Sequence, residues 1–147
     1  MSSEPGFELE ERGKRLVASW WGDWDEAAAM SFAHRIREFV DRPRDAAPAL
    51  VVDARQMSGC KILARGALAD LQNEMRDKLR NSVYVASTPA MRGVCLWIVK
   101  VGEDPKAKVV DRIEQVEDCL DQDSSRVGSA QESIIRQLRK LSKEVES

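Results

Sequence analysis

The sequence predicts an α/β fold in which helices pack on a mixed β-sheet. Short β-branched, apolar runs alternate with longer stretches whose apolar residues recur every three or four positions. This alternation gives the order ββαβαβαβα, with one further helix appended at the C-terminal end. An opening hairpin contributes an antiparallel pair of strands and the later alternation contributes parallel pairs, so the predicted sheet is mixed.

The hairpin occupies the first part of the chain. Apolar and charged residues alternate from Phe7, which predicts a strand over Phe7–Arg12, and Gly13 starts a tight turn. The returning strand is predicted over Arg15–Trp21. Residues 1–6 are expected to be disordered.

A first helix is predicted from about Trp24 to Asp41. Asp23 is the expected N-cap, and Glu26 three residues later completes a capping box. Its apolar face comprises Ala29, Phe32, Ala33, Ile36, Phe39 and Val40.

The centre of the sheet is predicted at Leu50–Asp53, a continuous apolar run typical of a strand buried on both faces. Arg55–Cys60 is interpreted as a loop and Lys61–Arg80 as the second helix. The apolar face of that helix comprises Ala64, Leu68, Leu71, Met75 and Leu79.

The rest of the domain is predicted from shorter signals. Thr88 followed by a proline is typical of a helix start, which favours a helix from Pro89 to about Val99, although residues 94–99 (VCLWIV) also suit a strand. Strands are expected at Ser82–Ala86 and Lys108–Val110, and a fourth helix at Arg112–Gln122.

The C-terminal part is predicted to be a linker and an amphipathic helix. Residues 123–130 are small and polar, and residues 131–147 carry a narrow apolar stripe of Ile134, Leu138, Leu141 and Val145. Such a helix docks on its own sheet, on a partner, or on a second copy of the chain in a homodimer. The predicted domain therefore spans residues 7–122.

Composition excludes several classes of protein. The chain has 23 basic and 25 acidic residues, a balance that argues against a dedicated nucleic-acid binder. No run of 18 apolar residues exists, so no membrane span is expected, and the polar N-terminus is not a signal peptide. The three cysteines are far apart and favour reduced thiols in the cytoplasm.

The sequence offers no arrangement typical of an enzyme. The single histidine, His34, lies about 160° from the centre of the first helix's apolar face and is expected to be exposed. Paired acidic residues fall at helix starts and on polar faces, and no glycine-rich phosphate loop occurs. We therefore predict no catalytic residues, no metal site and no cofactor.

Four segments resemble the STAS domain of anti-sigma-factor antagonists, and especially its SpoIIAA-like members. They are LVVDARQMSG (Leu50–Gly59), Arg65–Leu68, SVYVAS and AKVVDRIEQVEDCL, within a likeness that covers about Phe7–Asp121. The resemblance implies a non-catalytic regulatory module that acts by protein–protein contact. It also implies a phosphorylation motif, Asp-Ser followed by Gly, near Lys61, where this sequence has no serine. The nearest is Ser58, a candidate phosphoacceptor whose Ser-Gly pair is also ordinary turn chemistry.

Tryptophans and the C-terminal stripe are the candidate partner-binding residues. Trp20 and Trp21 are adjacent on a strand and point to opposite faces, so one of them, together with Trp24, is either covered by helices or part of a partner-binding patch. The resemblance also implies an alternative function, because distant SpoIIAA-like proteins resemble lipid-binding SEC14 domains. This alternative is a small-ligand or lipid carrier, with Trp97 and residues 94–99 lining an internal cavity.

Overall fold

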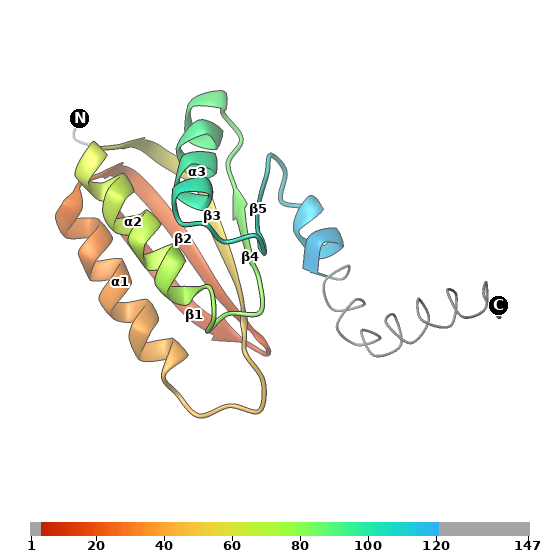
Figure 1. Ribbon diagram of the computed structural model, residues 1–147. Coiled ribbons are helices and arrows are strands. Elements are labelled where there is room, and N and C mark those ends of the chain that lie inside the picture. The colour runs from red at the N-terminus through yellow and green to blue at the C-terminus, as the bar shows by residue number, and fades with distance from the viewer. Residues whose placement is uncertain (1–3, 121–147) are drawn as a thin grey trace. The chain divides into compact units, whose positions relative to one another are not determined.

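The computed structural model describes residues 4–120, and its elements confirm the α/β fold class (Figure 1). In chain order they are β1 (Gly6–Arg12), β2 (Arg15–Trp24), α1 (Glu26–Val40), β3 (Ala49–Cys60), α2 (Ile62–Met75), β4 (Ser82–Val85), α3 (Pro89–Val101) and β5 (Ala107–Val110). Residues 115–120 are also helical, within the helix expected at Arg112–Gln122. The linker at 123–130 and the helix at 131–147 lie outside the described residues.

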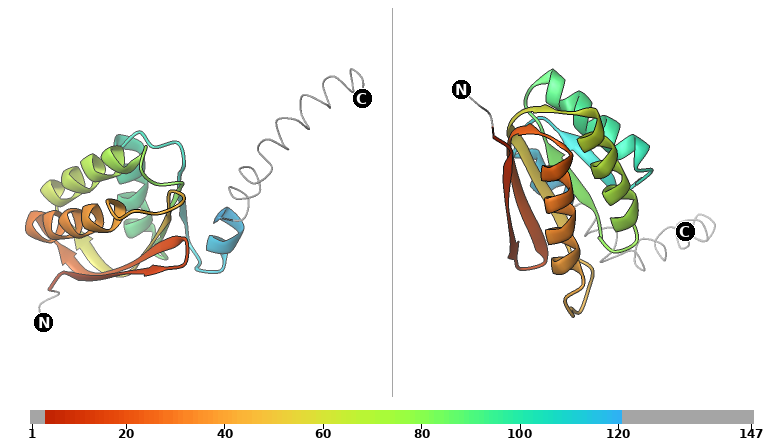
Figure 2. Two further views of the ribbon diagram at one scale, coloured as in Figure 1. Left: turned by 90° about the horizontal axis from the view of Figure 1, so that it is seen from below. Right: turned by 90° about the vertical axis from the view of Figure 1, so that its left-hand side faces the viewer.

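The five strands form one mixed sheet in the order β1-β2-β3-β4-β5. β1 and β2 pair antiparallel, and every later pair is parallel. From β2 onward, each strand lies beside the strand that precedes it in the chain, and the sheet always grows in the same direction. Right-handed crossovers between such strands place every connecting helix on the same face of the sheet. Figure 2 shows α1, α2 and α3 together on one side of the strands, with α2 packed against both neighbours.

The core lies between this helix layer and the sheet. Alternate residues of β2 face the helices, which buries Leu16, Ala18, Trp20 and Trp24 completely. The two indole rings lie 4.7 Å apart, centroid to centroid. Phe32 of α1 meets the Trp20 ring edge-on at 5.1 Å, a favourable geometry for aromatic pairs.

β2 is longer than its sequence predicts, and this moves the start of α1. The strand continues to Trp24, and Asp25 rather than Asp23 is the N-cap, accepting a hydrogen bond of 2.9 Å from the Ala28 amide. Gly22 has a φ of +85°, which a glycine adopts without strain, so the chain passes it and stays in the sheet.

β3 is also longer, and the loop predicted at Arg55–Cys60 is wrong. The register passes from Ser19–Asp53 to Trp21–Gln56, so β3 holds one extra residue at that point. A second shift inserts Ser58 between the partners of Gly22 and Asp23. These β-bulges break the alternation of apolar and polar residues, which is why the sequence pattern is typical of a loop.

Of the two remaining helices, α2 is shorter than the sequence predicts and α3 begins where the sequence predicts. α2 ends at Met75 instead of Arg80, because the Arg80 amide donates to the Pro48 carbonyl oxygen at 2.9 Å and draws the chain toward β4. The helix beginning at Pro89 is confirmed: the Thr88 side chain accepts a hydrogen bond of 3.2 Å from the Met91 amide, and residues 94–99 are helical. Within residues 4–120, no helix combines the length and apolar character needed to cross a membrane.

Candidate functional site

Most of the exposed large apolar side chains belong to the three helices. Residues 4–120 contain eight large apolar side chains that are exposed, and six of these belong to α1, α2 and α3. The six are Met30, Ile62, Leu63, Leu96, Trp97 and Val101. Isolated exposed apolar residues are ordinary, whereas a grouped set is typical of a surface that binds another molecule.

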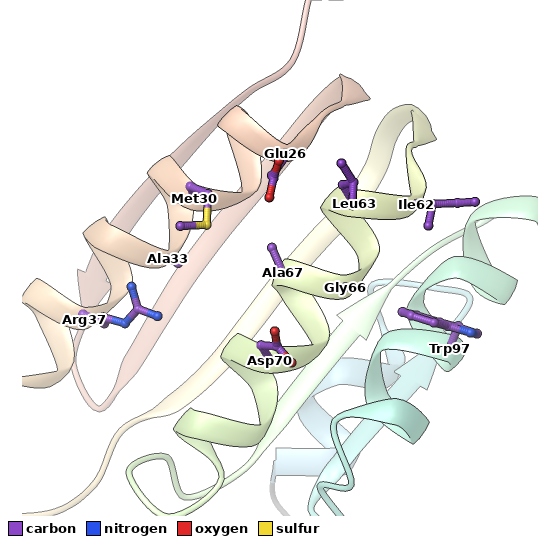
Figure 3. Close-up of a pocket in the computed structure, with 10 residues that line it drawn as sticks. All are labelled: Glu26, Met30, Ala33, Arg37, Ile62, Leu63, Gly66, Ala67, Asp70 and Trp97. Atoms are coloured by element: carbon purple, nitrogen blue, oxygen red, sulfur yellow. The ribbon is translucent and has the colours of Figure 1, made fainter.

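Four of these side chains border a groove of about 500 Å³, which we call the helix-layer groove (Figure 3). Its lining comprises Glu26, Met30, Ala33, Arg37, Ile62, Leu63, Gly66, Ala67, Asp70 and Trp97. In Figure 3, Leu63 and Ala67 lie on the side of α2 toward α1, while Ile62 and Gly66 lie toward Trp97. The groove therefore involves all three helices.

The helix layer is hollow here because α2 presents small residues outward. A Cβ atom added to Gly66 would meet no atom within 4 Å apart from its chain neighbours and the adjacent backbone of its own helix, so the space above this glycine is open. Ala33 and Ala67 also leave room in the groove, whereas Met30 and Leu63 extend further from their helices. The result is an open apolar depression.

Among residues 4–120, the two most exposed large apolar side chains lie at the N-terminal end of α2. Ile62 and Leu63 are consecutive and 77% and 64% exposed. Lys61 occupies the N-cap position without a capping side-chain hydrogen bond, and its ammonium instead lies 2.9 Å from Asp23 Oδ2. This hydrogen bond raises the pKa of Lys61. The exposed side chains of Ile62 and Leu63 thus lie beside Lys61 and Asp23, whose charges cancel in an ion pair.

The unpaired charge around the groove is acidic. Arg37 donates to both carboxylate oxygens of Glu74, at 2.9 and 2.7 Å, and this hydrogen bonding lowers the pKa of Glu74. Arg37 is therefore neutralised by its partner. Glu26 and Asp70 have no ion-pair partner within residues 4–120. A partner would therefore meet an apolar groove with free carboxylates on its border.

The tryptophans do not share one surface. Trp20 and Trp24 are completely buried, so the expectation that they belong to a partner-binding patch is corrected. The reason is that β2 continues to Trp24, which therefore keeps the same orientation as Trp20. Trp21 points to the opposite face and is 38% exposed, although its indole lies over Gly6.

The other residues singled out in the sequence are spread over the molecule. Ser58 is exposed and lies in β3 at the second bulge rather than in a loop. His34 is exposed as predicted, with Nε2 3.3 Å from Glu38. The stripe of Ile134, Leu138, Leu141 and Val145 lies outside the described residues.

The structure does not favour the internal cavity that a lipid carrier requires. Trp97 and Leu96 point outward from α3, whereas Val94, Cys95 and Ile98 are packed into the core. Among residues 4–120, no group of three or more His, Cys, Asp or Glu side chains is placed to hold a metal ion.

Sequence reasoning missed the helix-layer groove, although a signal for it exists. Met30, Ile62 and Leu63 are large apolar residues that fall outside the apolar stripes assigned to their helices. An apolar residue off the buried stripe of an amphipathic helix is exposed by geometry. Testing each helix for such residues would have located the surface.

No family model and no curated protein sequence matches the chain. Solved structures do match. The chain is similar to an anti-sigma factor antagonist from Mycobacterium paratuberculosis, with 19% identity and a TM-score of 0.60, over 83% of this chain and 97% of that one. It is also similar to an uncharacterised DUF3478-family protein with a SpoIIAA-like fold from Shewanella loihica, with 13% identity and a TM-score of 0.61, over 83% and 98% of the two chains.

A third similar structure is the anti-sigma factor antagonist SpoIIAA in its unphosphorylated form. The identity is 14% and the TM-score 0.59, over 79% of this chain and 96% of that one. Three structures of this kind share the arrangement of strands and helices described above. The chain therefore has a SpoIIAA-like fold, as its sequence predicts.

Proposed function

We propose that this protein is a non-catalytic regulatory module of the cytoplasm that binds a protein partner through its helix-layer groove. The observation that carries the proposal is the pair Ile62 and Leu63, exposed side by side at the edge of that groove. Two similar structures are anti-sigma factor antagonists, which is consistent with a regulatory role through protein contact.

The energetics suit an interface of this kind. Burying a large apolar side chain contributes about 1.5–3 kcal/mol, and Ile62, Leu63 and Met30 are all available for burial. A few well-seated side chains usually carry most of the binding free energy of an interface, and aromatic residues such as Trp97 are enriched among them. The groove thus offers both an anchor and a surrounding surface.

The chemistry of the described residues favours binding over catalysis. Burial raises the pKa of the Cys60 thiol to about 11 and that of Cys95 to about 12, so neither is a ready nucleophile at neutral pH. His34 is exposed and adjoins only a surface carboxylate, without the buried partners that a general base requires.

Three further candidate sites belong to the same proposal. The C-terminal stripe of Ile134, Leu138, Leu141 and Val145 supplies a second contact, to a partner or to a second copy of the chain. Trp21 is a third candidate contact on the opposite face. Ser58 is a weak candidate phosphoacceptor, and we expect partner binding by Ser58→Ala and Ser58→Asp to remain close to wild type, because no serine occupies the start of α2.

The proposal is tested with the double variant Ile62→Asp/Leu63→Asp. The full chain is used as bait in the native cytoplasm, and each captured protein is quantified against the wild-type bait. Ile113→Asp is the matched control, because Ile113 is exposed but lies outside the groove. We expect the double variant to lose a specific partner that the control retains. Equal capture by all three baits would contradict a role for the groove.

A further inference from the structure

We propose that the partner segment seated in the helix-layer groove is an amphipathic α-helix of another protein, with Lys or Arg residues flanking its apolar stripe. This inference rests on the proposed function and specifies the partner's chemistry. Three observations support it: the shape of the groove, the presence of Gly66 where the fold does not require a glycine, and the negative sign of the unpaired charge at the groove.

The shape favours a helix. The groove is open and crosses α2 between Met30 of α1 and Trp97 of α3, with small residues beneath it. Helices approach closely where one of them presents small side chains, and an amphipathic helix in an apolar groove is a recurrent mode of recognition. An enclosed pocket with converging polar groups would instead suit a small ligand.

Gly66 points to close approach from outside. A glycine in a helix interior destabilises it by roughly 0.5–1 kcal/mol relative to alanine. The space around Gly66 is open, and its φ lies outside the left-handed region, so nothing within the fold excludes a larger residue. A partner backbone passing over this position explains why the side chain is absent.

The unpaired charge selects a basic partner. Glu26 and Asp70 border the groove without ion-pair partners within residues 4–120, and Arg37 is held by Glu74. Flanking Lys or Arg residues on the incoming helix would complement these carboxylates and speed association. The same carboxylates disfavour an anionic lipid surface, which attracts basic segments instead.

The chain's own C-terminal segment matches the groove less well. On a helical wheel, Arg139 and Lys140 lie about 130° from the centre of the stripe formed by Ile134, Leu138, Leu141 and Val145, and the other basic residues lie further away. If residues 131–147 form a helix, its positive charge would therefore point away from any surface that the stripe contacts. For this reason we assign the groove to another protein.

The test selects peptides from a display library of random 16-residue sequences on the immobilised full chain. The same library is counter-selected on Gly66→Leu, which fills the open space. We expect the enriched peptides to repeat apolar residues at i, i+3 or i+4, and i+7, with Lys or Arg beside them. Enrichment of acidic or proline-rich peptides, or no enrichment at all, would overturn the inference.

A labelled peptide from the selection is then titrated with variants of the full chain. We expect Gly66→Leu to weaken binding of the peptide at least tenfold. Glu26→Lys/Asp70→Lys should also weaken it. The same charge-reversal variant should restore binding of a second peptide, in which Glu replaces the Lys residues. Gly66→Ala, which adds one methyl group, is the milder variant if Gly66→Leu proves unfolded by circular dichroism. Binding that is indifferent to both the Gly66 and the charge-reversal variants would overturn the inference.

Two further probes separate the alternatives. The first probe is a peptide of residues 131–147, and the second is a vesicle that contains anionic phospholipid. We expect each probe either not to bind the chain or to bind the wild-type chain and Gly66→Leu with the same affinity. Groove-dependent binding of either would replace our assignment by self-association or membrane contact. If Ile62→Asp/Leu63→Asp abolishes capture of a partner that offers no basic helix, the proposed function stands and this inference falls.

Discussion

The Tyr84 hydroxyl donates a hydrogen bond to the side-chain carbonyl oxygen of Gln72, in the buried space between β4 and α2. The Gln72 amide nitrogen donates to Ser82 Oγ at 3.1 Å and to Asp104 Oδ2 at 2.8 Å. One side chain of α2 therefore ties the helix to β4 and to the turn before β5. The helix fixed in this way carries Ile62, Leu63 and Gly66, so the network also sets the position of the groove.

We predict that Gln72→Met lowers the free energy of unfolding by about 1–3 kcal/mol, because it leaves buried polar groups unsatisfied while preserving volume. Urea denaturation measures the change. The matched substitution Gln56→Met, at an exposed position of β3, should change stability by less than about 0.5 kcal/mol. Equal stabilities for the two variants would mean that the network does not hold α2.

Leu68 and Leu63 belong to the same helix but face opposite environments. Leu68 is buried against the sheet, and Leu68→Ala should cost about 2–5 kcal/mol, as expected for a large-to-small core substitution. Leu63→Ala removes an exposed side chain and should change stability by less than about 0.5 kcal/mol. Thermal denaturation of the two variants side by side is sufficient. A silent Leu68→Ala would refute the assigned orientation of α2.

Two glycines should respond to alanine in opposite directions. Gly66→Ala should stabilise the protein by roughly 0.5–1 kcal/mol, because the added methyl group meets open space and alanine favours the helix. Gly22→Ala should destabilise it, because φ is +85° and the new Cβ would lie 2.2 Å from the Glu4 carbonyl oxygen. Chemical denaturation distinguishes these outcomes. A loss of stability in Gly66→Ala would show that something within the fold already occupies that space.

The buried thiols of Cys60 and Cys95 should resist alkylation in the folded protein. Burial raises their pKa values from 9.0 to about 11 and about 12, so at pH 8 almost no thiolate is present. We predict that Cys119→Ser, which leaves only these two thiols, reacts with iodoacetamide at pH 8 in urea but not in buffer. Rapid labelling in buffer would show that the core opens readily around Cys60 at the end of β3 or around Cys95 of α3.

The same pKa values predict a dependence of stability on pH. Below pH 9 both thiols are protonated in the folded and unfolded chains, and their contribution to stability is fully present. Between about pH 9 and 11 the unfolded chain releases protons that the folded chain retains, so the free energy of unfolding should fall. The Cys60→Ala/Cys95→Ala variant should show a smaller fall in that range.

Deleting residues 128–147 should leave the described domain folded. All the strands of the sheet precede this segment, so the deletion removes none of them. We predict an unchanged α/β circular dichroism signature, together with a lower oligomeric state or loss of partner capture. Sedimentation measures the first effect and affinity capture the second. Unfolding of the truncated chain would mean that the C-terminal helix belongs to the core.

The sequence predicted the fold wherever one periodicity dominated. The apolar stripe with Leu68 and Leu71, the buried run at Leu50–Asp53 and the Thr88–Pro89 helix start all lead to elements that the structure contains. It failed where β-bulges interrupted the pattern, as at Ser58. A bulge depends on pairing with another strand, so local sequence alone does not reveal it.

The site was harder to predict, for a related reason. The sequence leaves Trp24 as a candidate for an interaction patch because it predicts a strand that ends at Trp21, whereas three more residues of strand place Trp24 in the core. The helix-layer groove arises from three helices that are distant in the sequence. Its apolar members became recognisable as one surface only after α2 had been placed between α1 and α3.

Site-specific photo-crosslinking shows directly whether a protein partner contacts the helix-layer groove. A photoreactive amino acid is incorporated at Leu63, and in a second chain at Glu10, an exposed position of β1 at the edge of the sheet. We expect a discrete crosslinked partner from position 63 and none from position 10. A partner that crosslinks from position 10 but not from position 63 would contradict it.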